Sequence, residues 1–432
     1  MDYGVVFLTI GILLFFIAIG APIGFGLLFS GFCGLLVSEG LAVTLQTFRT
    51  SPFESTYSWN LTVLPLFIMM GALANIGGLG DSVYSALEKW LSPIRAGSAI
   101  ATIFGCAFFG ATTGSSIATV VSLGRIVVPK MRSLGYDVKL AVSSVTSGGL
   151  LGILIPPSIP LVIYASIGNV SIPRLLLAAY IPGAITVIAF ALTCFILGNF
   201  GYVSPPRSKL VIKDALLATK QTVSVFILII VIFAALYSGI LTATEVGAFG
   251  LLMVIILSAR GLLRHRGAIF GAFKNGVTTT CMIFLMIIGA KIFGHVLTIS
   301  GLTGWLSEII LSIALPPLLI IVIILLIYIP LGCILDGISM YLITLPVFLP
   351  IVSSLGYDLV WFGILMVKVV EMGLLTPPVG LNVYAMKTVV PDVSLTTIFR
   401  SVIPFLIAEV AVVSVLVLFP LLSLWIPTQA YG

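Results

Sequence analysis

Two short stretches of small and polar residues could bind a cation. The first runs from Gly110 to Ser116 and contains two threonines and two serines, and the second runs from Gly332 to Ser339 and contains Asp336. Hydroxyl, carbonyl and carboxylate oxygens are the ligands that hard cations prefer. Each stretch is therefore a candidate binding site for a small cation such as Na⁺.

A Pro-Pro pair follows each stretch, Pro156-Pro157 after the first and Pro377-Pro378 after the second. Proline lacks an amide hydrogen and disfavours helical geometry in the residue before it, so each pair is predicted to interrupt a helix. Inside a membrane, the freed backbone groups need partners. Free carbonyls can bind a cation, and free amides at the start of the next helix can bind an anionic substrate.

The two sets of features belong to one internal duplication. Pro129 to Asp137 and Pro350 to Asp358 share six of nine residues, and both the blocks and the Pro-Pro pairs are 221 residues apart. The aspartates that close the two blocks are predicted to begin helices. Duplicated transporters place their binding sites where helices are interrupted. The repeat therefore predicts two ion sites beside a central cavity.

Each of these features also has a structural interpretation. Glycine and proline are common in membrane helices, where they serve packing and kinks. Asp336 could cap a helix within its own turn, although a carboxylate inside a membrane is a functional candidate by default. Two Pro-Pro pairs in register, each with a glycine-containing polar turn upstream, favour the functional interpretation.

Other charged residues within apolar sequence are interpreted first as structural. Lys368 and Glu371 are one helical turn apart and are predicted to pair. Lys291 and His295 are four residues apart and are interpreted as a buried or snorkelling pair. Arg125 is predicted to reach back to a membrane interface or to cap hairpin carbonyls.

Composition identifies the elements that must hold these residues. The chain has 432 residues, of which 60% are hydrophobic and 8% charged, whereas soluble domains carry about 25% charge. Apolar runs of spanning length recur along it, so it is predicted to be an integral membrane protein whose first run is a retained helix. The five cysteines show no paired spacing and are interpreted as reduced packing residues. The predicted spans are 3–19, 22–38, 60–78, 175–199, 222–240, 242–258, 275–297 and 399–425.

Charge predicts the orientation of the repeats. The basic segments Arg207 to Lys220 and Arg260 to Lys274 are separated by two spans, so they share one side, which the positive-inside rule makes cytoplasmic. The first repeat block carries Lys130 and Arg132, where the second has Ile351 and Ser353. The first block is thus predicted to be cytoplasmic and the second external. The repeats would then be inverted.

The predicted architecture is an all-α polytopic membrane protein. Residues 97–131 and 314–354 are predicted to form re-entrant hairpins, and 138–168 and 359–390 single crossings broken at their Pro-Pro pairs. This topology places both termini outside and 15 of the 20 lysines and arginines inside.

No enzyme signature accompanies these features. The sequence lacks a Walker A motif, a dinucleotide fingerprint, H-E-x-x-H and G-x-S-x-G. Its two histidines cannot build a zinc site without many carboxylates, so no transition metal is expected. We therefore expect no catalysis, no nucleotide and no organic cofactor. Uphill transport would draw on an ion gradient.

The same residues resemble the large membrane subunit of TRAP (tripartite ATP-independent periplasmic) transporters, of the DctM and SiaM type. The resemblance extends over nearly the whole chain and is strongest at Gly110 to Asp137, Pro156-Pro157-Ser158 with Tyr164, Gly332 to Gly337, and Met372 to Asn382. It implies an elevator-type, Na⁺-coupled importer of an organic acid: a C4-dicarboxylate, sialic acid, or a related sugar or keto acid. It also implies two partners in the bacterial inner membrane system, a small four-helix membrane subunit and a periplasmic substrate-binding protein.

The resemblance further implies domains and ligands. The domains are scaffold helices and an arm in 1–96, the first transport repeat in 97–200, central scaffold helices, basic loops and an arm in 201–313, and the second repeat with a C-terminal helix in 314–432. The implied first Na⁺ site comprises Ser115, Ser116, Gly149, Gly152, Ile155 and Pro157. The implied second site comprises Gly332, Asp336, Gly337, Met372, Leu375 and Thr376. The substrate-cavity candidates are Thr113, Gly114, Ser158, Ser339, Pro378 and Asn382.

Three other functions compete with this one. A stand-alone Na⁺/dicarboxylate symporter would share the hairpins but would need no binding protein. A channel would need neither paired ion sites nor an inverted repeat that can rock. An intramembrane enzyme would need a nucleophile and a base at membrane depth. The identity of the acid, the Na⁺ stoichiometry and the oligomeric state stay open at the level of sequence.

Overall fold

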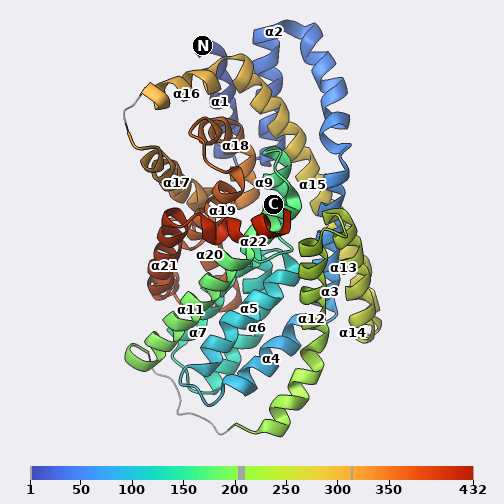
Figure 1. The fold of residues 1–432 in the computed structure, drawn as a ribbon, viewed down its shortest axis with the longest axis vertical. Helices are drawn as coiled ribbons and strands as arrows, with labels where there is room; N and C mark the ends of the chain where they lie inside the picture. The colour runs from blue at the N-terminus through green and yellow to red at the C-terminus, as the bar shows by residue number, and fades with distance from the viewer. Residues whose placement is uncertain (1, 203–209, 313–314, 432) are drawn as a thin grey trace.

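The computed structural model describes residues 2–202, 210–312 and 315–431, and every regular element within these ranges is a helix (Figure 1). The prediction of an all-α fold is confirmed. The helices before the first repeat are α1 (Tyr3–Ala18), α2 (Ile23–Thr56), the 3₁₀ helix η1 (Trp59–Thr62), α3 (Val63–Ile76) and α4 (Leu79–Leu91). Those of the first repeat are α5 (Gly97–Thr113), α6 (Ser116–Ser133), α7 (Val138–Gly148), α8 (Leu151–Leu154), α9 (Ile159–Ile167), α10 (Ile172–Ala178) and α11 (Tyr180–Phe200).

The second half of the chain continues in the same way. The helices between the repeats are α12 (Ile212–Ser238), α13 (Ala243–Leu257), α14 (Ala259–Arg264), α15 (Arg266–Ile299) and α16 (Leu302–Ser312). Those of the second repeat are α17 (Pro317–Ile334), α18 (Gly337–Ser354), α19 (Leu359–Leu375), α20 (Leu381–Val389), α21 (Leu395–Leu418) and α22 (Leu421–Tyr431). The basic residues Arg207 and Lys209, and the predicted hairpin start at 314, lie outside the described residues.

Many of the described helices are long and apolar enough to cross a membrane. Six meet this condition singly, and the number rises to eight if two bent helix pairs each form one span. α2 and α15 have 34 residues each and extend well beyond the predicted spans 22–38 and 275–297. Both helices continue through polar residues, because helix formation does not require apolar side chains. α2 bends at Gly40, whose φ of +79° suits glycine.

The predicted span 399–425 is wrong at its C-terminal end. α21 ends at Leu418, and a separate helix, α22, begins at Leu421. Pro420 lies between them and cannot donate the amide hydrogen that a continuous helix would require.

Two helix pairs occupy the residues of the predicted hairpins. α5 and α6 meet at Gly114-Ser115, and α17 and α18 meet at Leu335-Asp336. In Figure 1 the first pair lies in the lower half of the molecule and the second pair in the upper half. The turns that join the helices carry the candidate ion ligands.

The Pro-Pro segments also lie between helices. α8 ends at Leu154 and α9 begins at Ile159, with a bend of 40° between the two parts of this helix pair. α19 ends at Leu375 and α20 begins at Leu381. The peptide bond within each Pro-Pro pair is cis. In both repeats, a Pro-Pro pair thus lies in a non-helical segment between two helices.

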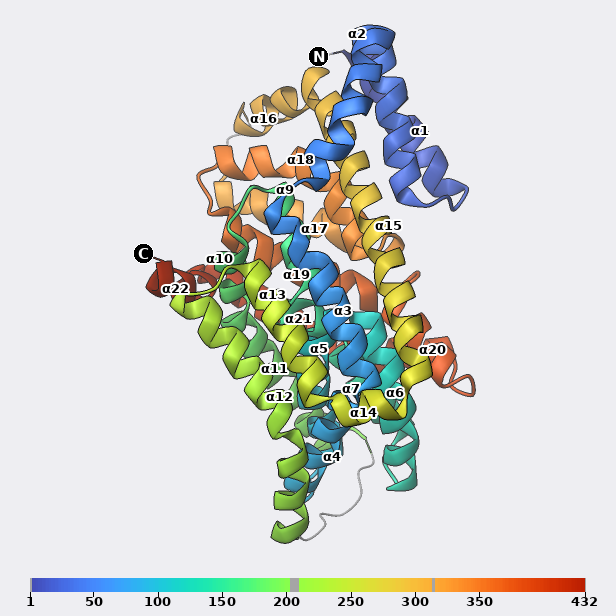
Figure 2. The ribbon, with the colours of Figure 1, turned by 90° about the vertical axis from the view of Figure 1, so that its right-hand side faces the viewer.

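The two repeats pack through equivalent contacts. The first helix of each pair packs on the first part of the following broken helix, α5 on α7 and α8, and α17 on α19. The second helix of each pair packs on the other repeat, α6 on α20 and α18 on α9 (Figure 2). Each turn is therefore held by a broken helix of its own repeat and by one of the other.

The long helices α2 and α15 pack closely against each other. A Cβ atom added at Gly31 would lie 2.8 Å from Ile292 Cγ2, and one added at Gly289 would lie 2.8 Å from Leu27 Cβ. Small residues allow helix backbones to approach in this way inside membranes. α15 runs from α14 in the lower half of the molecule to α16 near its top (Figure 1).

Candidate ion-binding site

The first turn is shaped by a glycine and a helix cap. Gly114 has a φ of +62°, which glycine adopts without steric cost. Ser115 follows in an extended conformation and is the N-cap of α6, where its Oγ accepts a hydrogen bond from the Ala118 amide at 3.4 Å. Thr113 Oγ1 lies 3.3 Å from Thr119 Oγ1. The turn therefore presents hydroxyl and carbonyl oxygens side by side.

The first turn lies directly on the first break. A Cβ atom added at Gly110 would lie 2.3 Å from Gly152 Cα, so the two backbones are in contact. A Cβ atom added at Gly152 would lie 3.0 Å from the Ser115 carbonyl oxygen, and one added at Gly114 would lie 3.3 Å from the Pro157 carbonyl oxygen. Glycine at these positions lets carbonyls of the turn and the break approach one another.

Asn382 joins this turn to the second repeat. Its side chain is fully buried, and its Nδ2 donates hydrogen bonds to Ser116 Oγ at 2.5 Å and to the Thr146 carbonyl at 3.4 Å. Asn382 Oδ1 and the Ser147 Oγ are also buried, and neither has a hydrogen-bond partner among the described residues. A buried oxygen without a partner is costly, and a bound cation would satisfy it.

Two other residues of the implied first site and one substrate-cavity candidate, Ser158, lie on the broken helix that faces this turn. Gly149 is close to it, because a Cβ atom there would lie 3.2 Å from the Ser116 carbonyl oxygen. Ile155 is extended at the end of α8, next to the cis Pro156-Pro157 bond. Ser158 is the N-cap of α9, and its Oγ donates a hydrogen bond to the Ile153 carbonyl.

The second turn carries the one carboxylate among the implied ligands. Asp336 is the N-cap of α18, as its structural interpretation predicts, and it accepts hydrogen bonds from the amide of Ser339 at 3.2 Å and from its hydroxyl. The Asp336 side chain is nevertheless exposed. With Ser339 it lines a cavity of about 400 Å³ that Met282 and Met286 of α15 close on the other side. The cap role leaves the carboxylate accessible to an ion.

The second break repeats the contacts of the first. A Cβ atom added at Gly373 would lie 2.6 Å from the backbone of Gly332, and one at Gly337 would lie 3.1 Å from Val370. Thr376 is extended after Leu375, and its Oγ1 donates a hydrogen bond to the Met372 carbonyl at 2.7 Å. The candidate substrate residue Pro378 is exposed beside this break.

A buried ion cluster lies next to the second break. Lys368 Nζ lies 3.2 Å from Glu371 Oε2, so the predicted pair is confirmed. Lys368 also pairs with Glu409 of α21 and donates a hydrogen bond to Thr186 Oγ1 of α11 at 3.0 Å. All three charged side chains are fully buried. Sequence reasoning missed Glu409, because no spacing along the chain relates α21 to α19.

The other singled-out charges lie elsewhere. Lys291 and His295 are both exposed, so the buried form of their predicted pair is wrong and the snorkelling form stays a prediction. Lys291 also lines two cavities. Arg125 is also exposed, and no hydrogen bond from it to a carbonyl occurs among the described residues. The predicted helix starts are confirmed: Asp137 and Asp358 accept hydrogen bonds from amides two residues ahead, at 2.8 and 2.6 Å.

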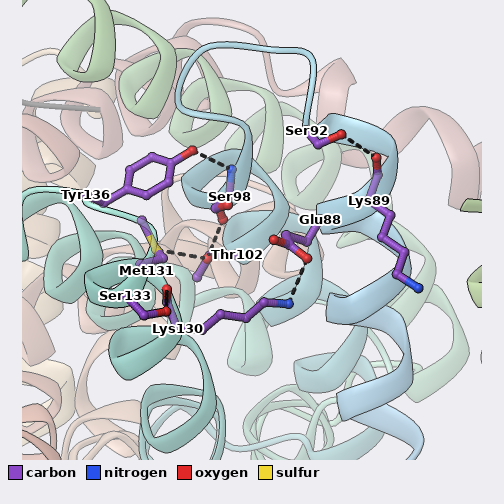
Figure 3. Close-up of polar contacts among 9 residues, drawn as sticks. All are labelled: Glu88, Lys89, Ser92, Ser98, Thr102, Lys130, Met131, Ser133 and Tyr136. Atoms are coloured by element: carbon purple, nitrogen blue, oxygen red, sulfur yellow. Dashed lines mark hydrogen bonds and ion pairs between the residues drawn. The ribbon is translucent and has the colours of Figure 1, made fainter. Parts of the chain in front are cut away.

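Polar contacts hold the end of the α5–α6 pair that is remote from the Gly114-Ser115 turn (Figure 3). Lys130 Nζ lies 2.7 Å from Glu88 Oε2 of α4, and the Ser98 amide donates a hydrogen bond to the Tyr136 hydroxyl at 3.3 Å. Nearby, Arg132 Nη1 lies 2.7 Å from Asp392 Oδ2 in the segment between α20 and α21. The hydrogen bond from Arg132 lowers the pKa of the Asp392 carboxyl.

Comparison with known proteins decides the family of the chain. Residues 10–422 match the family model described as tripartite ATP-independent periplasmic transporter, DctM component. The chain belongs to the DctM family. As a DctM protein it is the large permease component of a TRAP transporter and a multi-pass membrane protein.

Individual relatives support this assignment. This chain is 27% identical over 416 residues to the sialic acid TRAP transporter large permease SiaM of Vibrio cholerae. The similarity covers 96% of this chain and 96% of SiaM. The chain is 29% identical over 438 residues to the C4-dicarboxylate large permease DctM of the same organism, with 96% and 95% coverage. The fold is similar to that of the YdaH transporter of Alcanivorax borkumensis, with a TM-score of 0.61 at 16% identity over 89% of this chain and 90% of that one.

The candidate ion ligands of this chain therefore divide into two groups. Gly149, Gly152 and Asn382 contact the first turn or lie close to it, and Gly373, next to Met372, contacts Gly332 beside the second turn. Within the described residues no cluster of three or more histidine, cysteine, aspartate or glutamate side chains could hold a transition metal. The candidate ligands are hydroxyl, amide and carbonyl oxygens and the Asp336 carboxylate, which are the oxygen types that hard cations prefer.

Proposed function

We propose that this DctM protein imports an organic acid and couples the import to Na⁺. The observation that carries the proposal is the oxygen set at the first turn, where Asn382 contacts Ser116 and its own Oδ1 is buried without a partner among the described residues. We propose that an ion at this oxygen is also bound by carbonyls of the turn and the break. Na⁺ binding would therefore favour the closed packing of the turn on both repeats.

A second Na⁺ would bind at the other turn. Asp336, Thr376 and the backbone around Gly332 and Gly373 supply oxygens there, and the Asp336 charge would be neutralised by the ion. When bound, Na⁺ supplies positive charge beside the amides at the helix starts. An anionic substrate would then meet a more favourable potential than in the ion-free protein, which is the physical basis of coupling.

The substrate class is supported by the relatives. Two of them are named for sialic acid and for C4-dicarboxylates, and both substrates carry carboxylate groups. The hydroxyls of Thr113, Ser158 and Ser339 and the amide of Asn382 are the polar groups proposed to line the substrate cavity. These neutral groups would orient an acid, and the helix N-termini would stabilise its charge.

The proposed mechanism is an elevator. The α5–α6 and α17–α18 pairs, the broken helices, α11 and α21 would move together as a transport domain. The long helices α2 and α15, with α1, α3, α12 and α13, would form the scaffold. The contacts of each helix pair with both broken helices support this division, because they tie the two repeats into one unit.

The proposed assembly follows the tripartite family description. A periplasmic protein would deliver the substrate, and a small four-helix membrane subunit would cover part of the apolar outer surface. The complex would reside in the bacterial inner membrane, with the basic segments in the cytoplasm and both termini in the periplasm.

Reconstituted transport tests this function. The chain and its small subunit are placed in proteoliposomes, and uptake of radiolabelled organic acids is measured with an inward Na⁺ gradient or an equal K⁺ gradient. Uptake that requires both Na⁺ and the binding protein supports the proposal. Na⁺-driven uptake without the binding protein would instead indicate a stand-alone symporter, and uptake indifferent to Na⁺ would exclude the ion sites.

A further inference from the structure

Two neighbouring cavities share the side chain of Lys291. The first, of about 460 Å³, lies among α15, α18 and the end of α9. The second, of about 430 Å³, lies among α15, η1 and the segment between α9 and α10. Ile167, Asn169 and Lys291 line both. Each volume is in the range of pockets that hold small organic ligands.

Lys291 is unusual in its position. It lies about two turns before α15 ends at Ile299, within a helix long and apolar enough to span a membrane. No carboxylate in the described parts of the chain forms an ion pair with it. A charged side chain in a membrane segment is costly unless it faces a partner or water. Lys291 faces two cavities, and an anion in them would be its partner.

The second cavity is polar. Glu54, Ser58 and Asn60 line it on the side of α2 and η1. Ser166, Asn169 and Ser171 line it on the side of α9 and α10. Hydroxyl and amide groups of this kind exchange hydrogen bonds with a hydroxylated ligand. The cavity thus combines one cation, one carboxylate and several neutral hydrogen-bonding groups.

We propose that the Lys291 cavities bind an organic acid with one carboxylate and several hydroxyl groups before it reaches the ion sites. This inference rests on the proposed transport function and specifies its substrate class. The acid's carboxylate binds Lys291 and the Asn169 amide, and its hydroxyls donate to Glu54 and the serines. The second negative charge of a dicarboxylate would enter the same cavity as Glu54 and would be repelled.

The location fits an entry site. Lys291 lies near the C-terminal end of α15, whereas the basic segment around α14 adjoins the N-terminal end. The C-terminal end of α15 is external in the proposed topology. α15 belongs to the proposed scaffold and η1 leads directly into the scaffold helix α3, while α9 and α18 belong to the proposed transport domain. A ligand between them would be released when the transport domain moves.

Direct binding tests the inference without any ion gradient. The full chain, purified with its small subunit in lipid nanodiscs, is titrated with gluconate, which has one carboxylate and five hydroxyls, and with succinate, which has two carboxylates. We expect gluconate to bind more tightly than succinate. Loss of a charge-assisted hydrogen bond in Lys291→Met should weaken gluconate binding about tenfold or more. Lys291→Arg should retain binding, and Glu54→Gln should improve succinate binding.

The controls distinguish anion binding at Lys291 from a general loss of surface charge. Arg125→Met removes another exposed cation that lines neither cavity, and it should leave gluconate binding unchanged. Equal gluconate affinity in Lys291→Met and the parent, or no binding at millimolar gluconate, would overturn the inference. So would an effect of Lys291→Met confined to association with the periplasmic protein, because Lys291 would then contact an acidic partner surface. Gluconate binding without Na⁺-driven uptake would refute the transport function and leave the binding site standing.

Discussion

At the scale of single residues, the most informative side chain is Asn382. It lies in the second repeat and reaches the turn of the first, where it contacts Ser116 and the Thr146 carbonyl. Its Oδ1 is buried and has no partner in the described part of the chain. One amide therefore couples the position of α20 to the candidate ion site.

Replacing this amide should weaken ion coupling. Asn382→Ala removes a hydrogen-bond donor and a candidate Na⁺ ligand. We expect the Na⁺ concentration for half-maximal uptake to rise about tenfold, because losing one buried hydrogen bond at the ion site weakens binding by about that factor. The measurement is uptake as a function of Na⁺. Asn199→Ala, which removes an exposed amide on α11, is the control. An unchanged Na⁺ dependence in Asn382→Ala would remove Asn382 from the site.

The Lys368 cluster makes a prediction about stability. Lys368→Ala would leave Glu371 and Glu409 buried without their cation, and breaking a buried pair in this way costs roughly 3–5 kcal/mol. We expect a large fall in the melting temperature of the detergent-solubilised protein. The triple variant Lys368→Met, Glu371→Gln, Glu409→Gln carries no buried charge and should recover much of the loss. Equal melting of Lys368→Ala and the parent would contradict a stabilising role for the lysine.

At the scale of elements, close backbone contacts hold each turn on its broken helix. Gly110 meets Gly152 in the first repeat, and Gly332 meets Gly373 in the second. A methyl group at Gly110 or Gly373 does not fit, because it would lie 2.3 or 2.6 Å from the facing backbone. The glycines thus explain how α5 and α17 approach the breaks closely enough for the proposed ion ligands of turn and break to meet.

A single methyl group should therefore separate turn from break. Gly110→Ala would place a Cβ atom 2.3 Å from Gly152 Cα, and we expect about 1–3 kcal/mol of destabilisation, the usual cost of overpacking. Na⁺-driven uptake should fall with it. Gly271→Ala on α15 has open space around the new methyl group and should be neutral or slightly stabilising. Thermal unfolding and uptake of the two variants are compared, and equal behaviour would refute the need for glycine at this contact.

The Arg132–Asp392 pair joins α6 to the segment before α21 and makes a prediction about pH. Arg132 lowers the Asp392 pKa in the folded protein, so the pair stabilises the fold at pH values above the unfolded carboxyl pKa. That contribution is lost as the pH falls through the lowered value. The melting temperature of Asp392→Asn should be slightly below that of the parent at neutral pH, and the difference should vanish in acid. A difference that persists in acid would exclude the pair as its cause.

At the scale of the whole molecule, the repeats are interlocked and the long helices lie outside them. α6 packs on α20 and α18 on α9, so neither repeat is complete without the other. α15 contacts this unit mainly through α18. A moving unit within a static frame would slide along this contact.

A cross-link between frame and unit should therefore arrest transport. A Cβ atom at Gly294 of α15 would lie 3.0 Å from Pro346 Cβ of α18, slightly closer than the roughly 3.5–4.5 Å of disulfides, so small movements suffice. In a cysteine-free background, Gly294→Cys with Pro346→Cys should lose uptake on oxidation and regain it on reduction. Gly26→Cys with Phe16→Cys has the same 3.0 Å separation within the proposed scaffold and should keep its uptake. Full uptake by the oxidised Gly294/Pro346 pair would contradict the elevator.

Much of the architecture follows from local chemistry that the sequence contains. Apolar runs predicted the spans, proline predicted the breaks, and the aspartates that close the repeat blocks predicted the helix starts at Asp137 and Asp358. These features depend on residues close together in the chain. For the same reason the ends of α2, α15 and α21 were predicted less well, because apolar length does not determine where a helix ends.

The order of residues along the chain specifies which of them supply oxygens, where the helices break and that both features occur twice. The folded arrangement of the helices specifies which oxygens meet. It brings Asn382 to Ser116 and Glu409 to Lys368, and it places Lys291 and Glu54 on one cavity. The reason is physical: helix periodicity relates residues within a few turns, whereas contacts between helices depend on side-chain packing between segments far apart in the chain.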